Sequence, residues 1–342
     1  MNWKVFFRVK PVCNMSSRLK VLLVRNNFPK KAIDLLSTRF DLEVCKMSNI
    51  NGKSVTTQDI IDCIPGKFAL FCFSEIDVNE AVLKAAGPNF KVVGTMSVGY
   101  NHVDLTAMKK YGVRLGYTPG VLTETVAELA VGLVIATSRR FFEANRELKT
   151  GGWKEWNPTW MCGRGISNSV VGIIGCGNIG TSIAEKLSKF KISQLLYTSR
   201  CEKPDVKALG GRLVSVDVLV KSSDFIVVAM ALNEDTKFIV NRDRIASMKP
   251  NAILVNVGRG ELIDQDALVE ALQEKRIRGA GLDVMTPEPL PLDHPLMTMD
   301  NVLLLPHIGS STLETEDEMA MLTAQNILAV LDGKPMPCEV IL

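Results

Sequence analysis

Near its middle the chain reads Val170-Val171-Gly172-Ile173-Ile174-Gly175-Cys176-Gly177-Asn178-Ile179-Gly180. An apolar run rich in β-branched residues leads into G-x-G-x-x-G, and a helical pattern, expected over 179–190, follows it. In this arrangement the first glycine makes a tight turn, the second lets the backbone approach a pyrophosphate, and the third lets helix and strand pack closely. The helix N-terminus adds free N–H groups and a partial positive charge. The stretch therefore predicts a dinucleotide-binding unit with phosphate contacts from Gly175, Gly177, Asn178, Ile179 and Gly180.

The position of this motif indicates a second domain. It begins at residue 175 of a 342-residue chain, which is long enough for two domains with their own cores. Upstream, apolar runs at 20–24, 69–73 and 92–95 alternate with helical patterns, which predicts a parallel α/β sheet. The Pro119-Gly120 pair marks the end of this first unit.

The rest of the chain alternates in the same way. One long helix is expected over 123–149, with Thr123 as its N-cap. A final amphipathic helix, 312–331, lies beyond the last predicted strand, and we expect it to pack back on the first domain. Between these helices, strands are expected at 170–174, 194–197, 225–229, 253–256, 279–283 and 302–304.

These elements predict an α/β fold with two Rossmann-like or flavodoxin-like domains, each built on a parallel sheet. The dinucleotide-binding domain, 118–305, is inserted into a discontinuous substrate domain made of 19–117 and 306–342. Residues 1–18 form a basic N-terminal extension, since the first 33 residues hold eight Lys or Arg and no Asp or Glu. A mitochondrial presequence is the alternative interpretation of this start.

Composition excludes several kinds of partner. The net charge of +3 is too small to favour nucleic acid or an anionic membrane, and no apolar run approaches the ~20 residues that span a bilayer. The eight cysteines contain no C-x-x-C pair and, with three histidines, show no metal-ligand spacing. We therefore expect a small-molecule ligand, no metal and a reducing compartment, the cytoplasm.

The residues after the second strand of the dinucleotide unit bear on the choice of cofactor. The acid that usually binds the ribose 2′-hydroxyl about 20 residues beyond the glycines is missing, and Ser199-Arg200 stands there instead. A hydroxyl and a guanidinium fork can bind a 2′-phosphate, which a carboxylate would repel. The sequence thus favours NADP(H) over NAD(H). In the alternative interpretation, Arg200 is a solvated surface charge and Glu202 binds the ribose.

Three polar residues follow apolar strands at the edge where open α/β sheets bind ligands. Arg259 follows the 253–257 run, Glu288 lies in a Pro-Glu-Pro-Leu-Pro segment, and His307 follows the last strand. Carbonyl reduction needs such a set: a cation for the substrate carboxylate, a proton donor with a pKa of about 7, and a carboxylate that orients the donor. Because His102 lies in a loop and His294 in a turn-like segment, His307 is the candidate donor.

A loop between residues 151 and 160 carries three of the four tryptophans, Trp153, Trp156 and Trp160. Large aromatic side chains are enriched in interfaces and in buried contacts. We expect this loop to pack either against a second subunit or against its own chain.

Together these residues resemble the D-2-hydroxyacid dehydrogenases, from about residue 19 to the end of the chain. Within that family the likeness is greatest to the subgroup that reduces glyoxylate and hydroxypyruvate. The passages that carry the resemblance are Thr-Met-Ser-Val-Gly at 95–99, Gly-Tyr-Thr-Pro at 116–119, the tryptophan-rich 152–160, 171–175, Gly-Arg-Gly at 258–260, 281–284 with 287–291, and 305–310.

The resemblance implies a role for each candidate residue. Arg259 would bind the substrate, Glu288 would orient the histidine, and His307 would act as acid and base. The backbone N–H groups of Val98 and Gly99 would bind the substrate carboxylate. Besides the fingerprint residues, cofactor contacts would come from Ser199, Arg200, Ala231, Val257, Asp283 and Gly309.

The implied activity is NADPH-dependent reduction of glyoxylate to glycolate and of hydroxypyruvate to D-glycerate. The implied assembly is a homodimer in which Trp156 reaches toward the partner's active site. Two alternatives stay open: an NAD-dependent dehydrogenase of D-3-phosphoglycerate or another 2-ketoacid, and a non-catalytic dinucleotide sensor like the C-terminal-binding-protein corepressors, which share the fold and a similar residue triple. The chain departs from the family's pattern at Cys176, Asn101 and Leu232-Asn233, where Leu, Asp and Leu-Thr-Pro are common.

Overall fold

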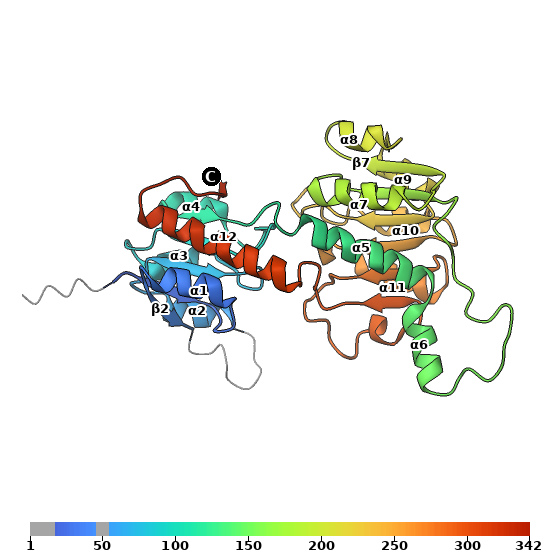
Figure 1. The fold of residues 1–342 in the computed structure, drawn as a ribbon, viewed down its shortest axis with the longest axis horizontal. Helices are drawn as coiled ribbons and strands as arrows, with labels where there is room; N and C mark the ends of the chain where they lie inside the picture. The colour runs from blue at the N-terminus through green and yellow to red at the C-terminus, as the bar shows by residue number, and fades with distance from the viewer. Residues whose placement is uncertain (1–17, 46–54) are drawn as a thin grey trace, which may run out of the picture. The chain divides into compact units, whose positions relative to one another are not determined.

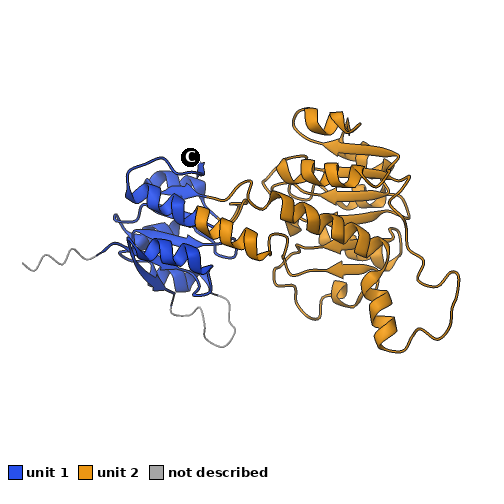
Figure 2. Cartoon of the chain, viewed as in Figure 1, with its two compact units in different colours: residues 1–95, 103–116, 323–342 blue, residues 96–102, 117–322 orange. Residues whose placement is uncertain are grey.

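The computed structural model describes residues 18–45 and 55–342. The chain forms two compact units, which Figure 2 colours separately. Unit 1 comprises Met1–Thr95, Val103–Gly116 and Thr323–Leu342, and unit 2 comprises Met96–His102 and Tyr117–Leu322. Each unit contains a predominantly parallel sheet with connecting helices, so the α/β fold class predicted from the sequence is confirmed.

Unit 1 contains, within the described residues, a six-stranded sheet in the order β13-β5-β4-β3-β1-β2. The pairs are parallel except for β13–β5, which is antiparallel. The strands are β1 (Lys20–Leu23), β2 (Asp41–Val44), β3 (Ala69–Cys72), β4 (Val92–Thr95), β5 (Arg114–Gly116) and β13 (Glu339–Val340). The helices are α1 (Lys30–Ser37), α2 (Thr57–Cys63), α3 (Glu80–Ala86), α4 (Leu105–Tyr111) and the end of α12 (Leu313–Leu331).

The end of α12 packs on this sheet against two glycines. A Cβ atom on Gly94 would lie 2.9 Å from Thr323 Cγ2, and one on Gly116 would lie 2.6 Å from Asn326 Cβ. Glycine in these strands therefore allows the helix to approach the sheet closely. The last helix, red in Figure 1, thus packs on strands formed by the first third of the chain.

Unit 2 contains a parallel sheet of seven strands in the order β12-β11-β10-β9-β6-β7-β8. The strands are β6 (Val170–Ile174), β7 (Gln194–Thr198), β8 (Arg212–Leu213), β9 (Phe225–Val228), β10 (Ile253–Asn256), β11 (Gly279–Leu282) and β12 (Val302–Leu304). The helical elements are α5 (Thr123–Ser138), α6 (Phe141–Lys149), α7 (Asn178–Ser188), α8 (Pro204–Ala208), α9 (Val216–Ser222), α10 (Arg242–Ala246), η1 (Gly260–Leu262), α11 (Gln265–Gln273) and η2 (Pro295–Thr298).

The strand order of this second sheet reverses at β6. Strands β7 and β8 lie on one side of β6, and β9 to β12 lie on the other. Ligands of open α/β sheets bind at the carboxyl ends of the strands where the order reverses, because the connecting chains leave a crevice there. Since the glycine motif directly follows β6, the sheet places it at this reversal point.

The prediction of a single helix over 123–149 was wrong, because this segment forms α5 and α6. Arg140 adopts a left-handed conformation with φ 55°, which interrupts the helical hydrogen bonds. The carbonyl of Ser138 instead accepts a hydrogen bond from the N–H of Arg164 at 2.9 Å. A later part of the chain therefore takes the place of the next helical turn.

Other element boundaries differ from prediction by small amounts. Thr123 is the first residue of α5 and not its N-cap, which is Leu122 without a side-chain hydrogen bond. Strands β9 and β11 each end one residue earlier than expected. Strands β2, β8 and β13 were not predicted because they lack a continuous apolar run, and β5, which reads Arg-Leu-Gly, has one apolar side chain.

The division into units passes through α12, between residues 322 and 323, whereas the sequence places the domain boundary at 305/306. Residues 96–102 also group with unit 2. The assignment of 306–322 to a functional domain stays a prediction. The expected N-terminal extension lies outside the described residues, apart from Arg18. Within 18–45 and 55–342, no helix is both long and apolar enough to cross a membrane.

Candidate active site

The glycine motif forms an open turn at the N-terminus of α7. Gly175 has φ +96°, and a Cβ atom there would lie 2.4 Å from Met230 Cβ. A Cβ on Gly180 would lie 2.1 Å from the carbonyl oxygen of Gly175, whereas one on Gly177 would meet no atom within 4 Å. The first and third glycines are thus required by close packing, and the open space beside Gly177 is what a pyrophosphate needs. No side chain caps α7, which leaves its first N–H groups for an anion. The turn therefore fits a dinucleotide.

The end of β7 presents a cation beside this turn. The N–H of Gly175 donates to Thr198 Oγ1 at 3.0 Å, which ties the glycine turn to the end of β7. Arg200, two residues further on, is exposed, and it forms no ion pair with any residue that the structure describes. Glu202, the alternative ribose ligand, forms an ion pair with Lys207 at 3.0 Å.

A buried asparagine shapes the turn that carries Arg259. Asn256, the last residue of β10, is 1% exposed. Its Oδ1 accepts the N–H of Gly258 at 3.0 Å, and its Nδ2 donates to the carbonyl of Arg259 at 2.8 Å. Side-chain bonds to the nearby backbone fix such turns. Asn256 thereby fixes the backbone from which the Arg259 side chain extends.

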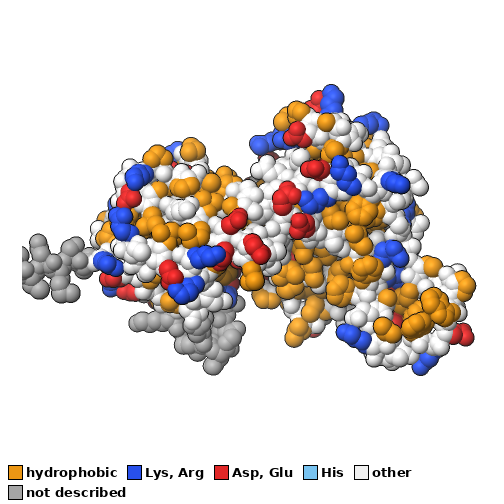
Figure 3. All heavy atoms as spheres, in the orientation of Figure 1, with side chains coloured by type: hydrophobic (Ala, Val, Ile, Leu, Met, Phe, Trp, Pro, Cys, Tyr) orange, Lys and Arg blue, Asp and Glu red, His pale blue; other side chains and the backbone are white. Residues whose placement is uncertain are grey.

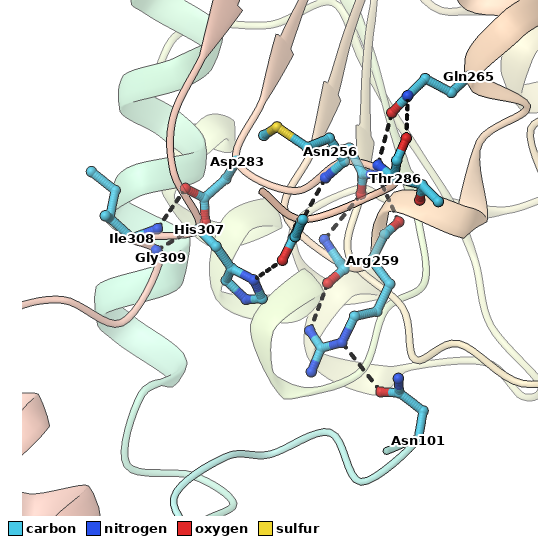
Figure 4. A network of polar contacts seen from close by, with 12 residues as sticks. Asn101, Asn256, Arg259, Gln265, Asp283, Thr286, His307, Ile308 and Gly309 are labelled. Carbon is cyan, nitrogen blue, oxygen red and sulfur yellow. Dashed lines mark hydrogen bonds and ion pairs between the residues drawn. The ribbon is translucent and has the colours of Figure 1, made fainter. Parts of the chain in front are cut away.

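Neutral groups hold the Arg259 guanidinium. Its Nη1 donates to the Gly258 carbonyl at 2.7 Å, and its Nε donates to Asn101 Oδ1 at 3.3 Å (Figure 4). A Cβ on Gly99 would lie 2.2 Å from Nη2, so the guanidinium lies directly against that backbone. Burial lowers the pKa of Arg259, and the charge of Glu288 opposes this effect. An arginine remains charged at neutral pH, so a partly desolvated cation lies beside the 98–99 segment.

His307 and Glu288 form an ion-pair-like contact. Nδ1 of His307 lies 2.8 Å from Glu288 Oε2, and Glu288 Oε1 accepts the N–H of Met285 at 2.9 Å. Burial is the largest influence on Glu288 and raises its pKa. The hydrogen bond and charge of His307, the Met285 N–H and the charge of Arg259 together outweigh burial, so the pKa of Glu288 lies below its usual value. Glu288 is therefore ionised at neutral pH and accepts a hydrogen bond from Nδ1–H of His307. This leaves Nε2 of His307 free to exchange a proton with a ligand.

Asp283 organises the loop that carries His307. It is 1% exposed, its carboxylate accepts the N–H of Ile308 at 2.8 Å and of Gly309 at 2.9 Å, and its carbonyl accepts the N–H of His307 at 2.8 Å. Burial raises the pKa of Asp283, although these hydrogen bonds and the charge of His307 act against it. His307 itself has φ 54°, a left-handed conformation that turns the chain directly after β12.

Gln265 ties down the loop that carries Glu288. It is the first residue of α11, its Oε1 accepts the N–H of Thr286 at 2.9 Å, and its Nε2 donates to the Thr286 carbonyl. Nε2 also lies 3.3 Å from Nε2 of His294. Gln265 thus holds both polar groups of one backbone residue that stands two positions before Glu288. Gln265 was not predicted from the sequence, because its partner lies 21 residues away and no local pattern marks the pair.

The other two histidines lack these features. His102 is 7% exposed, and burial, assisted by the charge of Arg259, lowers its pKa to about 4. It is therefore neutral at physiological pH. His294 begins η2, where its Nδ1 accepts the N–H of Leu296 at 3.2 Å.

The structure brings most of the predicted substrate-site residues together. Figure 4 shows Arg259, His307 and Asp283 in one cluster with Asn101. Glu288 belongs to this cluster because it contacts His307. Gly99 belongs to it because its backbone packs against Arg259. All of these residues belong to unit 2.

The other predicted ligand residues differ in exposure. Val98 and Ser199 are half-buried, and Val257 is buried directly after β10. Ala231 is exposed, and its carbonyl accepts the hydroxyl of Thr236 at 2.9 Å. The Trp156 side chain is exposed.

An apolar surface covers α6 and the loop after it. None of the α6 residues is buried, and Trp156 is 89% exposed while its ring stacks edge-on against that of Trp153 at 5.8 Å. Figure 3 shows hydrophobic side chains gathered where Figure 1 places α6. The large exposed hydrophobic residues of this α6 surface are Phe141, Phe142, Leu148, Trp153, Trp156 and Trp160. The sequence left two alternatives for the tryptophan loop, packing against a second subunit or against its own chain. For Trp156 the second alternative is wrong, because its side chain is exposed.

No group of three His, Cys, Asp or Glu residues that could hold a metal ion occurs in the described part of the chain. The seven cysteines among these residues are all free thiols. The cluster brings together the imidazole of His307, the carboxylate of Glu288 and the guanidinium of Arg259.

This fold and this cluster define a dinucleotide-dependent oxidoreductase. Residues 131–309 match the family described as D-isomer specific 2-hydroxyacid dehydrogenase, NAD binding domain. The human glyoxylate reductase/hydroxypyruvate reductase is 43% identical over 323 residues, which are 94% of this chain and 98% of that protein. The chain therefore belongs to the D-isomer specific 2-hydroxyacid dehydrogenase family, as its sequence motifs indicate.

Solved structures also resemble this chain over nearly its whole length. The TT0316 protein of Thermus thermophilus has a TM-score of 0.86 and 36% identity, with 94% of this chain and all of that chain covered. An NADPH-dependent glyoxylate/hydroxypyruvate reductase from Sinorhizobium meliloti, solved with NADP and malonate, has a TM-score of 0.80 and 28% identity over 95% of this chain and 97% of its own.

Proposed function

We propose that this protein reduces small 2-ketoacids with NADPH, converting glyoxylate to glycolate and hydroxypyruvate to D-glycerate. The observation that carries the proposal is the 2.8 Å contact between His307 Nδ1 and Glu288 in one cluster with Arg259. Relatives that bear the name glyoxylate reductase/hydroxypyruvate reductase and cover nearly the whole chain support the choice of substrates.

Each side chain has a role in this reaction that its contacts suit. The Arg259 guanidinium and the backbone N–H groups of Val98 and Gly99 bind the substrate carboxylate, so that the C2 carbonyl lies near His307. The ionised Glu288 orients the ring and stabilises its protonated form. Nε2 of His307 then gives its proton to the carbonyl oxygen as C2 is reduced. Bound NADPH supplies the hydride for C2.

The contacts of the cofactor follow from the turn after β6 and from the ends of the other strands. Gly175, Gly177 and the N-terminal residues of α7 would hold the pyrophosphate. Asp283, Ala231, Val257 and Gly309 follow β11, β9, β10 and β12 in the chain and would line the nicotinamide.

Initial rates test this function directly. Glyoxylate, hydroxypyruvate, pyruvate and 3-phosphohydroxypyruvate would each be assayed with NADPH and with NADH. We expect the highest kcat/KM for glyoxylate or hydroxypyruvate with NADPH. A clear preference for the phosphorylated substrate with NADH would favour the phosphoglycerate dehydrogenase alternative. Tight NADPH binding without turnover of any substrate would favour a sensor.

We propose that Arg200, assisted by Ser199, gives the preference for NADPH. Replacing Arg200 by alanine should lower kcat/KM for NADPH by about 10- to 100-fold, since a charge-assisted hydrogen bond to phosphate is lost. The value for NADH should change little. Lys221→Ala, which removes an exposed cation from α9, is the matched control. An unchanged NADPH to NADH ratio in the Arg200 variant would assign the preference to other residues.

We propose that the α6 surface is the interface of a homodimer, in which Trp156 of one chain reaches the active site of the other. Replacing Phe142 and Leu148 by glutamate should convert a dimer of 37.6 kDa chains into monomers in sedimentation velocity, because two charges would be buried in an apolar contact. Val218→Glu, at an exposed position of α9, should leave the dimer intact. Sedimentation of the wild-type protein as a monomer at micromolar concentration would exclude this interface.

We infer that the protein works in a reducing compartment, the cytoplasm. The free state of the seven described cysteines supports this location, since thiols persist where glutathione and thioredoxin keep them reduced.

A further inference from the structure

The loop that carries Glu288 has few contacts of its own to fix it. Between the buried residues Val284 and Leu290, none of the residues 285–289 is buried. In the described part of the chain, no backbone–backbone hydrogen bond involves this loop, and its two prolines have no N–H to donate. The position of the Glu288 carboxylate therefore depends on other contacts.

Side chains supply the hydrogen bonds of this loop. Oε1 of Gln265 accepts the N–H of Thr286 at 2.9 Å, and its Nε2 donates to the carbonyl of the same residue. Oε1 of Glu288 accepts the N–H of Met285 at 2.9 Å. Because a glutamine amide carries an acceptor and donors side by side, it can hold both polar groups of one backbone residue. Gln265 thereby fixes Thr286 to the start of α11.

Close packing restrains the same loop. Gly260 directly follows Arg259, and a Cβ atom there would lie 2.2 Å from the carbonyl carbon of Met285 and 2.4 Å from Thr286 Oγ1. The two backbones are thus in direct contact, and the turn on the Arg259 side is itself fixed by the side chain of Asn256. The loop lies against this fixed turn, and Gln265 holds it there.

The position of Thr286 matters because Glu288 lies only two residues further on. Oε2 of Glu288 contacts Nδ1 of His307 at 2.8 Å. A shift of the loop by about 1 Å would break this contact, since hydrogen bonds between nitrogen and oxygen have a narrow range of distances. The imidazole would then be free to turn, and the rate of proton transfer depends on its placement.

We propose that Gln265 is a positioning residue for proton transfer, which acts through Thr286 and Glu288 on His307. This inference rests on the proposed function, because it takes His307 as the proton donor to a 2-ketoacid. It assigns to Gln265 an effect on turnover. Binding of the substrate carboxylate should not depend on Gln265, since Asn256 fixes the turn that carries the guanidinium.

Gln265→Met tests the two hydrogen bonds, because methionine keeps the length of the side chain and lacks the amide. We expect kcat for hydroxypyruvate to fall by roughly tenfold and KM to change by less than about twofold. Gln58→Met is the matched control. Gln58 is exposed in the first turn of α2, where its Nε2 donates to Asp62 at 2.8 Å, so its replacement should leave kcat unchanged. Circular dichroism and the affinity for NADPH show that each variant is folded.

A double-mutant cycle separates positioning from a general loss of structure. Glu288→Ala removes the group through which Gln265 is proposed to act. In that background Gln265→Met should change kcat by less than about twofold, because no carboxylate remains to be placed. If the methionine variant does not fold, Gln265→Leu, which also lacks the amide, takes its place in the same cycle.

The outcomes distinguish this inference from the proposed function. A wild-type value of kcat in Gln265→Met, or an equal loss of kcat with and without the Glu288 carboxylate, would overturn the inference and leave the reductase intact. A wild-type protein that does not reduce 2-ketoacids would instead contradict the proposed function, before any variant is compared.

Discussion

Replacing His307 by alanine is expected to lower kcat for hydroxypyruvate by roughly 10²–10⁴, the usual contribution of a positioned acid or base. The structure gives the reason: Nδ1 is engaged by Glu288 at 2.8 Å, so Nε2 is the site that exchanges a proton with the carbonyl oxygen. His102, whose pKa is lowered to about 4, is neutral and cannot replace it as a donor. Steady-state rates at saturating NADPH measure the effect.

A control shows whether the loss is chemical. The affinity for NADPH, followed by nicotinamide fluorescence, and the melting temperature of the variant should stay near the wild-type values, because His307 is partly exposed at a loop. Turnover within about fivefold of the wild type would mean that another group or water delivers the proton.

Replacing Arg259 by alanine is the second change with a large expected effect. Loss of a partly buried, hydrogen-bonded charge that pairs with the substrate carboxylate should lower kcat/KM by about 10²–10³. Arg259→Lys should recover only part of this, because an ammonium keeps the charge but cannot reproduce the planar fork that Asn101 and the Gly258 carbonyl orient. The measurement is kcat/KM for glyoxylate at fixed, saturating NADPH.

The comparison of the two Arg259 variants distinguishes binding from folding. Both should bind NADPH as the wild type does, since the glycine turn lies after β6 and Arg259 lies after β10. If Arg259→Ala retained kcat/KM within about threefold, the carboxylate would have to be bound elsewhere, and the assignment of this site would be wrong.

Much of the fold could be predicted from the sequence, because local patterns determine it. The run at 170–174 and the glycines after it specify a strand, a turn and a helix within a few residues of one another, and the structure has all three. Short buried strands of a parallel sheet are continuous apolar runs, so β3, β4, β9 and β10 were recognisable. Strands β2, β8 and β13 carry no such run and were missed.

The parts of the fold and of the site that could not be predicted depend on contacts between distant residues. Nothing near Arg140 in the sequence shows that the N–H of Arg164 will bind the carbonyl of Ser138 and end α5. Gln265 and Thr286 are joined only in the folded chain. Asn256 is the exception: a polar residue that ends an apolar strand is a visible signal, and its side chain shapes the turn that presents Arg259.

The central claim is that this chain transfers a hydride from NADPH to C2 of a small 2-ketoacid and a proton to its oxygen. The most direct test is incubation with hydroxypyruvate and NADPH that carries deuterium at both C4 positions, followed by mass spectrometry and chiral analysis of the product. The expected product is D-glycerate with one deuterium at C2. Formation of L-glycerate, or recovery of unchanged hydroxypyruvate from a protein that binds NADPH, would contradict it.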